Sequence, residues 1–335
     1  MNPKVLLVET GHSPLVNDKD GWWTDVLDYQ IYETVPTWWR RIEEFLRLDI
    51  VLALRARRIA HQYDVVWANS ERAGIVLAGI NKPLVVLVHH MASRKKKLVL
   101  RLAGIARKWT AIGYLTNADR DFMVSYYGVS DARFIKVVCQ DLAQFTPPEP
   151  VFDGPILSLG ASKRDYVTLV ESLMELPNYV TEIYAGSRFE GFYPQSAVRT
   201  LPDWVRFYDP IPSQETPALY ARARFVVLPL KNTTQFSAGM TSALEASAAG
   251  KAVIATNLPG MSSYIQDGVT GILVPPHDHA AMRDAIHKLW TQPELAHQMG
   301  VAGRKYIEAE FNPLIVNDKI RKFLADVYAE SQQFR

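Results

Sequence analysis

Residues 235–251, QFSAGMTSALEASAAGK, hold a single carboxylate, Glu245, in a run of Ser, Ala, Gly and Thr. A helix that begins in this run leaves backbone N–H groups without helical acceptors, and together with the helix dipole these groups attract an anion. Gly239 lets a ligand approach the backbone closely, and Ser237 and Thr241 add hydroxyl donors. Glu245, one turn deeper, can accept hydrogen bonds from a vicinal diol such as a ribose. The stretch predicts a phosphate or diphosphate site; the alternative is a capped helix with a solvated glutamate.

Other polar residues follow short apolar runs. Lys163 and Arg164 come after PILSLG (155–160), and His89 ends PLVVLVH (83–89). Gly11 and His12 follow KVLLVE (4–9) and are a weaker candidate for a phosphate or acceptor loop, because only one glycine is present. Ligands of open parallel sheets bind beyond the carboxyl ends of the strands, so these are the places where chemistry is expected. The alternatives are solvated surface cations and a structural histidine.

The apolar runs are mostly continuous rather than alternating, as strands buried on both faces are. Segments of helical period lie between them, which favours the α/β class with parallel sheets covered by helices. The predicted strands span 4–9, 64–69, 83–89, 111–116, 134–139, 155–160, 181–186, 205–210, 224–230, 252–257 and 271–276. The predicted helices include 165–175, 213–222, 237–249, 278–290 and a C-terminal helix within 312–331.

The chain of 335 residues is long enough for two domains. Four prolines in TPPEPVFDGP (146–155) indicate a linker. We expect one domain at 1–148 and a second at 149–312, each with its own doubly wound parallel sheet. Helix 313–331 is expected to pack back on the first domain.

Composition excludes several classes. One cysteine, Cys139, provides no disulfide framework, which favours a reducing compartment. No apolar run approaches the roughly twenty residues of a membrane span, and the start does not have the form of a signal peptide. Residues 72–118 contain nine basic residues and no acidic one, which indicates an anionic partner. No nucleic-acid motif is visible. We expect a cytoplasmic protein.

The segment TSALEASAAGKAVIATNLPGMSSYIQDGVTGILVPP resembles the C-terminal signature of retaining glycosyltransferase family 4. SLGASKRDYVTLVESL, YLTNADRDFMVSYYGVS and VVCQDLAQFTP extend the resemblance over most of residues 80–312. The resemblance implies two facing Rossmann-like domains, the B-type glycosyltransferase fold, with an N-terminal acceptor domain at 1–148 and a nucleotide-sugar-binding domain at 149–312. It also implies metal-independent transfer from a nucleotide sugar, with no metal site and no cofactor beyond the donor substrate.

The resemblance also implies roles for individual residues. Lys163 and Arg164 match the basic pair that neutralises the donor diphosphate, and Glu245 matches the glutamate that holds the ribose diol. His89 resembles the histidine that contacts the donor sugar. The turn whose amides hold the diphosphate falls on Gly239, Met240 and Thr241, with Ser237 and Ala238 before it. The glycine stands one place early, and Ser237 replaces a glutamate of the family motif.

We therefore expect a retaining hexosyltransferase that uses a UDP- or GDP-sugar in cell-envelope or exopolysaccharide synthesis, with a glycan or lipid-linked acceptor. A non-catalytic nucleotide-sugar-binding or scaffold protein is the alternative, and the Ser at 237 is its best support. A sugar-nucleotide epimerase of the same fold is less well supported, since no acid–base set for it is visible.

The basic stretch RKKKLVLRLAGIARKW (94–109) pairs cations with leucines, as amphipathic helices on anionic membranes do. We interpret it as a contact with the inner face of the cytoplasmic membrane or with a lipid-linked acceptor. TWWRRIEEFLRL (37–48) has two tryptophans beside two arginines, but we interpret 37–60 as core helix with a solvated basic face.

Overall fold

The computed structural model of the chain describes residues 3–9, 25–27, 35–93, 97, 104–147, 149–185 and 201–333. The chain forms two compact units. Unit 1 comprises Met1–Cys139 and Pro313–Arg335, and unit 2 comprises Gln140–Asn312. The proline-rich stretch 146–155, which the sequence suggested was a linker, lies inside unit 2. The segment before it is also bonded to unit 2: Gln140 N–H donates to the Phe311 carbonyl at 2.8 Å, and Arg304 donates to the Phe145 carbonyl. The roles expected of the two domains stay predictions.

Unit 1 contains a parallel sheet in the order β2-β1-β3-β4-β5-β6. Strands β1, β3 and β4 are buried along their whole length, as their continuous apolar runs predict. The strands are β1 (Val5–Val8), β2 (Asp25–Leu27), β3 (Val65–Ala68), β4 (Leu84–Val88), β5 (Ala111–Tyr114) and β6 (Phe134–Lys136).

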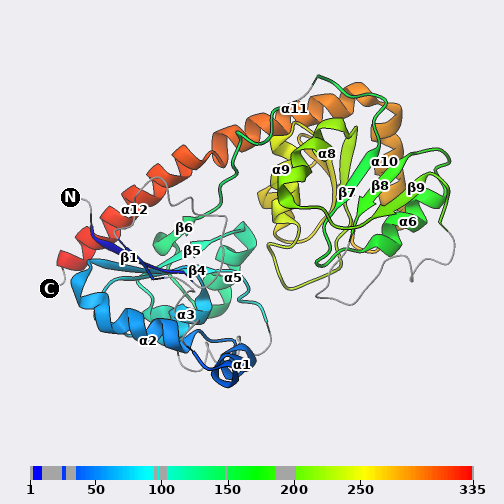
Figure 1. Cartoon of the computed structure of the whole chain (residues 1–335). Coiled ribbons are helices and arrows are strands. Elements are labelled where there is room, and N and C mark those ends of the chain that lie inside the picture. The colour runs from blue at the N-terminus through cyan, green and yellow to red at the C-terminus, as the bar shows by residue number, and fades with distance from the viewer. Residues whose placement is uncertain are drawn as a thin grey trace. The chain divides into compact units, whose positions relative to one another are not determined.

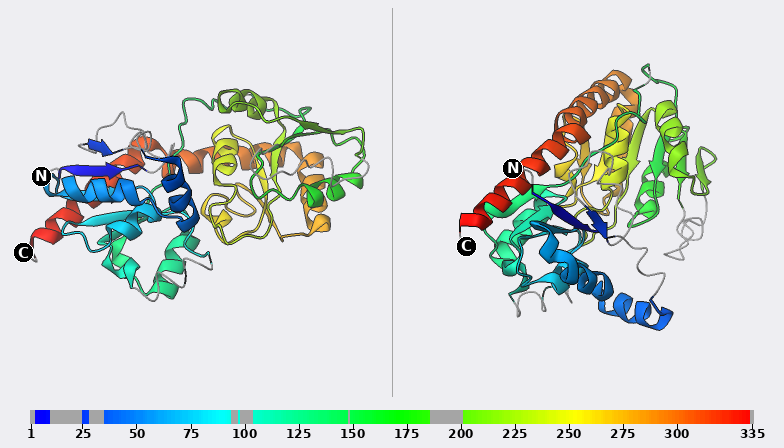
Figure 2. Two further views of the ribbon diagram at one scale, coloured as in Figure 1. Left: turned by 60° about the horizontal axis from the view of Figure 1, so that its bottom comes forward. Right: turned by 60° about the vertical axis from the view of Figure 1, so that its left-hand side comes forward.

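Helices cover both faces of this sheet, α2 and α3 on one and α12 on the other (Figure 1; Figure 2). Leu52, Ala56 and Leu77 pack with Leu6 and Val86 in the core under α2 and α3. The helices are α1 (Thr37–Leu46), α2 (Ile50–Ile59), α3 (Glu71–Leu77), α5 (Asn117–Tyr127) and α12 (Pro313–Gln333).

Unit 2 contains a second parallel sheet, in the order β12-β11-β10-β7-β8-β9. This is the strand order of a doubly wound dinucleotide-binding sheet, with the order reversing between β7 and β10. The strands are β7 (Ile156–Leu159), β8 (Thr181–Tyr184), β9 (Val205–Tyr208), β10 (Phe225–Leu228), β11 (Val253–Thr256) and β12 (Gly271–Val274).

Helices α6 and α10 pack on one face of this sheet, and α8 and α9 pack on the other (Figure 1). Leu169 and Leu173 of α6 meet Ile286 and Leu289 of α10 above Phe225. The helices are α6 (Tyr166–Met174), α8 (Thr216–Arg222), α9 (Met240–Ala248), α10 (His279–Thr291) and α11 (Pro293–Glu310).

The α/β class with two parallel sheets is confirmed. Every strand expected from the sequence is present, shortened at its ends, and the helices expected at 165–175, 237–249 and 278–290 form. Strand β2 and helices α3, α5 and α11 had not been predicted. β2 is only three residues long, too short to show a hydrophobic pattern.

Candidate active site

The loops after β7 and β10 meet at the switch point of the unit 2 sheet. Lys231 N–H donates to the Lys163 carbonyl at 2.9 Å, and Asp165 N–H donates to the Pro229 carbonyl at 2.9 Å. In doubly wound sheets, the crevice at such a switch point is where ligands bind. The backbone bonds therefore hold the predicted basic pair beside the chain segment that leads into α9.

Gly239 is the N-cap of α9 and has φ 81°, in the left-handed region that favours glycine. A Cβ here would lie 2.9 Å from Leu230 Cδ1, so any other residue would also force the Leu230 side chain to shift. In the described part of the chain the Gly239, Thr241 and Ser242 amides donate no hydrogen bond to a backbone carbonyl. Open amides at the start of a nine-residue helix form an anion site.

Met240 and Ala238, which the sequence placed in the anion-binding turn, do not have open amides. The Met240 N–H donates to the Ser237 carbonyl at 3.1 Å, so Met240 is not one of the open amides. Ala238 is buried, and its N–H donates to the Gln235 carbonyl at 3.1 Å. The open set therefore extends one residue further into α9 than the sequence suggested.

Arg164 is buried rather than presented to solvent, with 7% of its surface exposed. Its Nε donates to the Leu159 carbonyl and Nη1 to the Ser162 carbonyl, both at 3.0 Å, and Nη2 donates to Ser242 Oγ at 2.9 Å. Burial lowers the pKa of the guanidinium, but an arginine stays charged at any physiological pH. A positive charge is thus fixed beside the N-terminus of α9.

Lys163 stands in the left-handed backbone region with φ 58°. A lysine there is strained by roughly 1–2 kcal/mol relative to glycine. Strain of this kind concentrates at functional sites, where a side chain must occupy a fixed place. Lys163 is half-buried in the same loop as Arg164, so the loop carries two neighbouring cations.

Glu245 lies on the second turn of α9 and is half-buried. The Tyr220 hydroxyl donates to Glu245 Oε2 at 3.0 Å. Burial raises the pKa of Glu245, and the hydrogen bond from Tyr220 opposes this rise. Tyr220 is fully buried and lies 3.4 Å from the Ser242 carbonyl. A single carboxylate is therefore held in one orientation next to the anion site.

The structure thus brings Arg164, Gly239, Thr241 and Glu245 into one corner of unit 2. Ser242 and Tyr220 join them and had not been predicted. The sequence offers no signal for Tyr220, which comes from α8 and reaches α9 only in the folded chain. Ser242 is adjacent to the predicted turn, but its bond to Arg164 joins residues that are far apart in the chain.

His89 belongs to unit 1 and follows β4. Its Nε2 lies 3.0 Å from the Asn69 carbonyl, and its backbone N–H donates to Glu71 Oε2 at 3.0 Å. A carbonyl accepts only, so Nε2 carries the proton, and Nδ1 of the neutral ring is an acceptor. The sequence resemblance predicts that His89 contacts the donor sugar. With Nε2 bonded to Asn69, the ring nitrogen left for such a contact is an acceptor.

Carboxylates gather near His89 in unit 1. Asn69 Nδ2 donates to Glu9 Oε1 at 2.9 Å and to Oε2 at 3.0 Å. Asp119 is 1% exposed and forms a capping box with Thr116 at the start of α5. Burial is the main reason that the pKa of Asp119 is raised to about 6, and the negative charge of Glu71 raises this pKa further. This edge of the unit 1 sheet is rich in hydrogen-bond acceptors.

The sequence of the chain is similar to those of known proteins. The chain is 34% identical to a D-inositol 3-phosphate glycosyltransferase of Streptomyces bingchenggensis over 319 residues, which cover 81% of this chain and 67% of that relative. Residues 165–306 match the family model described as glycosyl transferases group 1. The chain belongs to this glycosyltransferase family. The sequence resemblance that predicted it is confirmed.

Further similarities agree. The glycosyltransferase is 27% identical to the D-rhamnosyltransferase WbpZ of Pseudomonas aeruginosa over 289 residues, covering 76% of this chain and 74% of the relative. Its fold is similar to that of the HepE protein of Anabaena solved with UDP, with a TM-score of 0.76, 17% identity and coverage of 96% of this chain and 100% of the other. These findings establish the B-type glycosyltransferase fold.

Some predicted features of the glycosyltransferase lie outside the described residues. Gly11 and His12 are among them, as are 94–96 and 98–103 of the basic stretch. The described remainder of that stretch ends in a short 3₁₀ turn, Ile105–Lys108, followed by the fully buried Trp109. No helix among the described residues is long and apolar enough to cross a membrane.

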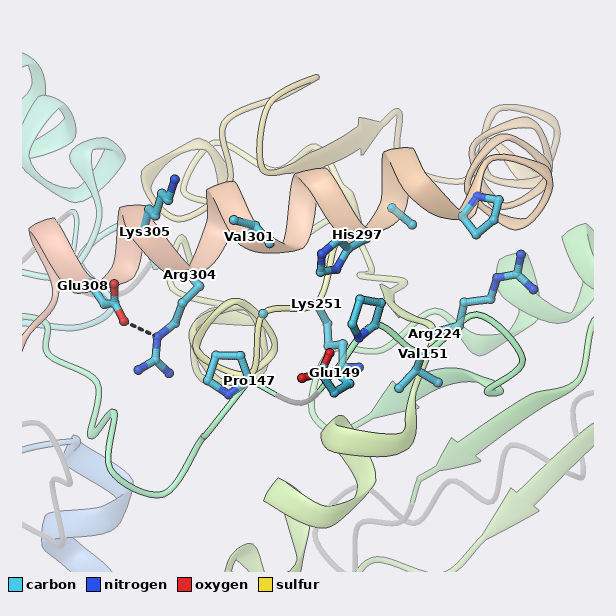
Figure 3. A pocket seen from close by; sticks show the side chains of 14 residues that line it. Pro147, Glu149, Val151, Arg224, Lys251, His297, Val301, Arg304, Lys305 and Glu308 are labelled. Carbon is cyan, nitrogen blue, oxygen red and sulfur yellow. Dashed lines mark hydrogen bonds and ion pairs between the residues drawn. The ribbon is translucent and has the colours of Figure 1, made fainter.

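A cavity of about 250 Å³ lies elsewhere in unit 2 (Figure 3). Arg224 and Lys251, which line it, precede β10 and β11, so the cavity is at the amino ends of these strands. Figure 3 shows His297 and Val301 of α11 above it. None of the predicted site residues line this cavity. The Lys251 ammonium donates to the Ala221 carbonyl at 3.0 Å, which gives this buried cation a structural role.

Proposed function

We propose that this glycosyltransferase transfers a sugar from a nucleotide-diphosphate sugar with retention of configuration and without a metal ion. One observation carries the proposal. A buried, fixed guanidinium (Arg164) and the open amides of Gly239, Thr241 and Ser242 converge at the switch point of a parallel sheet. Cations and amides aimed at a departing diphosphate stabilise its growing negative charge, which is the main electrostatic requirement of such a reaction.

The donor is proposed to lie along α9. The diphosphate contacts the α9 amides, Lys163 and Arg164, while Glu245 accepts hydrogen bonds from the ribose diol. Ser237 contacts the sugar where the family motif has a glutamate. The nucleotide is UDP or GDP, and UDP is favoured because the similar HepE protein was solved with UDP and with UDP-glucose.

In the proposed reaction His89 accepts a hydrogen bond from the donor sugar through Nδ1. The leaving phosphate takes the acceptor proton, so no glycosidase-type carboxylate pair is required. The acceptor is a glycan or a lipid-linked carrier in envelope or exopolysaccharide synthesis, and the sugar is a hexose. The similarity to the D-rhamnosyltransferase WbpZ is compatible with this class. Gly11 and His12 are proposed to contact the acceptor or the donor phosphate.

We propose a cytoplasmic enzyme that contacts an anionic membrane. The basic stretch 94–109 supports this by its charge, and Lys108 is exposed. Two other described cations of the stretch have local contacts: Lys97 lies over the Phe122 ring at 5.0 Å, and Arg107 donates to the Tyr127 carbonyl at 3.2 Å.

Release of nucleotide diphosphate from UDP-, GDP- and ADP-sugars tests the proposal directly. We expect slow release of UDP or GDP without acceptor, unchanged by a chelator, and an α-linked product from an α-linked donor. Lys163→Ala should slow this release about a hundredfold, because it removes a cation that faces the leaving diphosphate. Lys305→Ala is the matched control and should keep the parent rate, because Lys305 is an exposed lysine of the same unit beside the cavity at the amino ends of β10 and β11. Nucleotide-sugar binding without any turnover would favour the non-catalytic alternative.

A further inference from the structure

Helix α1 presents its apolar side to solvent. Trp38, Ile42 and Phe45 recur at the spacing of one helical face, and 62%, 38% and 80% of their surfaces are exposed. Leu46 beside them is 47% exposed. A surface helix of a globular protein normally turns such a stripe toward the core. In α1 the usual direction is reversed.

The side of α1 that faces the protein combines polar residues with one half-buried tryptophan, Trp39, whose indole nitrogen is buried. Its only buried residue is Glu43, which is 2% exposed and accepts the Val51 N–H at 2.7 Å. Arg40 Nε donates to the Val35 carbonyl at 3.0 Å. Among the helices and strands that the structure describes, none packs along the length of α1 (Figure 1). Polar bonds at both ends therefore hold α1 in place and leave the apolar arc outward.

The charge around this arc is positive. Arg41 and Arg47 of the α1 region are exposed, as are Arg55 and Arg58 on α2. Of the acidic residues in 37–60, Glu43 is used as above and Asp49 pairs with Arg72 at 2.8 Å. Only Glu44 is exposed. An exposed apolar arc with a tryptophan, flanked by cations, has the chemistry of a helix that lies in an anionic lipid interface.

We propose that α1 docks this glycosyltransferase on an anionic lipid surface, with Trp38, Ile42 and Phe45 at the boundary between headgroups and acyl chains. This docking proposal rests on the membrane contact given under the proposed function, and it assigns the apolar part of that contact to α1. The sequence had suggested that 37–60, which includes α1, was a core helix. The basic stretch 94–109 supplies no such arc among its described residues, since Ala106 and Trp109 are buried.

Sedimentation with lipid vesicles tests the proposal. The full chain should bind vesicles of phosphatidylglycerol and phosphatidylcholine, bind phosphatidylcholine alone poorly, and dissociate as salt rises. Trp38→Ser/Phe45→Ser should weaken binding to the mixed vesicles at least ~tenfold, because two interfacial aromatic side chains are lost. Leu314→Ser is the matched control, because Leu314 on α12 is 68% exposed and apolar; its vesicle binding should equal that of the parent chain.

Thermal melting of the same samples without nucleotide, with UDP and with GDP separates a failure of the docking proposal from a failure of the donor proposal. A double variant that keeps the parent's UDP-dependent stabilisation but loses the vesicles supports docking through α1. Equal vesicle binding by the parent and the double variant overturns docking through α1. So does a parent chain that does not bind vesicles, or one that self-associates through α1 instead. A parent that binds vesicles but gains no stability from UDP or GDP overturns the donor proposal and leaves α1 docking standing. Phe45→Ser alone repeats the comparison if the double variant melts early.

Discussion

The two sheets end in different chemistry at corresponding places. In unit 2 the strands beside the switch point lead to Lys163, Arg164 and the open amides of α9. In unit 1 the order β2-β1-β3 places a switch point between β1 and β3. The residues there are Glu9 and Asn69, joined by hydrogen bonds, with His89 after the next strand.

Sheet topology determines where the polar residues lie, and the individual side chains determine the charge there. Both sheets put polar residues at the carboxyl ends of buried strands, because that is where the chain leaves the core. The sign of the charge is set residue by residue. A corner of donors and cations suits a diphosphate, whereas a corner of carboxylates and an acceptor nitrogen suits hydroxyl protons of sugars. Variants at the cationic corner of unit 2 and at the acceptor-rich corner of unit 1 test this division.

The largest effect is expected at Lys163. Lys163→Gly removes the cation and suits φ 58°, so relief of backbone strain of about 1 kcal/mol offsets the greater freedom of glycine in the unfolded chain. We expect turnover of the nucleotide-sugar donor to fall about a hundredfold with the melting temperature nearly unchanged. Steady-state kinetics and calorimetry measure the two quantities. Full turnover in this variant would remove Lys163 from the cationic corner.

Glu245→Gln is expected to have the next largest effect on the donor site. Loss of a charged acceptor for the ribose diol should weaken UDP binding about tenfold or somewhat more. Isothermal titration with UDP and 2′-deoxy-UDP makes the test specific. The parent should discriminate strongly between the two ligands and the variant weakly. Equal discrimination by both proteins would show that Glu245 does not hold the ribose.

The sequence predicted the strands well and the contacts within the site only in part. Continuous apolar runs mark buried parallel strands, and strand ends mark the site, so Lys163, Gly239 and Glu245 could be found without a structure. Tyr220 could not, because its partner Glu245 lies on another helix. Nor could the burial of Arg164, whose three acceptors are two carbonyls of its own loop and a hydroxyl on α9.

Helix α1 shows that the sequence pattern of a helix does not predict how the helix is oriented. Its pattern of Trp38, Ile42 and Phe45 predicts an amphipathic helix correctly, but periodicity does not say which side faces the protein. The bond from Val51 N–H to Glu43 decides the direction, and it joins residues on two helices. Orientation of a helix is a tertiary property that a local pattern does not contain.

The raised pKa of Asp119 makes the stability of the protein depend on pH, which tests whether carboxylates are buried close together in unit 1. Its pKa of about 6 in the folded protein exceeds its ordinary value of 3.8, so between these pH values the folded protein binds more protons than the unfolded chain. Its contribution to stability therefore falls as pH rises through this window, by about 2–3 kcal/mol. Asp119→Asn keeps an acceptor for the Thr116 cap and should remove this part of the pH dependence.

Denaturant titrations of parent and variant at pH values across that window measure the effect. Asp131→Asn is the matched control, because Asp131 is an exposed aspartate of the same unit whose pKa is lowered by its hydrogen bond with Arg120. A parent profile that stays flat across the window would mean that Asp119 is not held in a low-dielectric, carboxylate-rich corner.

The smallest effect is expected from the choice of replacement at His89. Asparagine can place an oxygen near the position of Nδ1, and glutamine can place an N–H near that of Nε2. If Nδ1 accepts from the donor sugar, His89→Asn retains this function while His89→Gln retains only the bond to the Asn69 carbonyl. One hydrogen bond is worth about 1 kcal/mol, so kcat/KM should be about fivefold higher for the asparagine variant. The reverse order would mean that the bond from Nε2 to Asn69 is the functional one, and that His89 acts by ordering the loop after β4. Equal melting temperatures for the two variants are required for either conclusion, because both lose the imidazole ring.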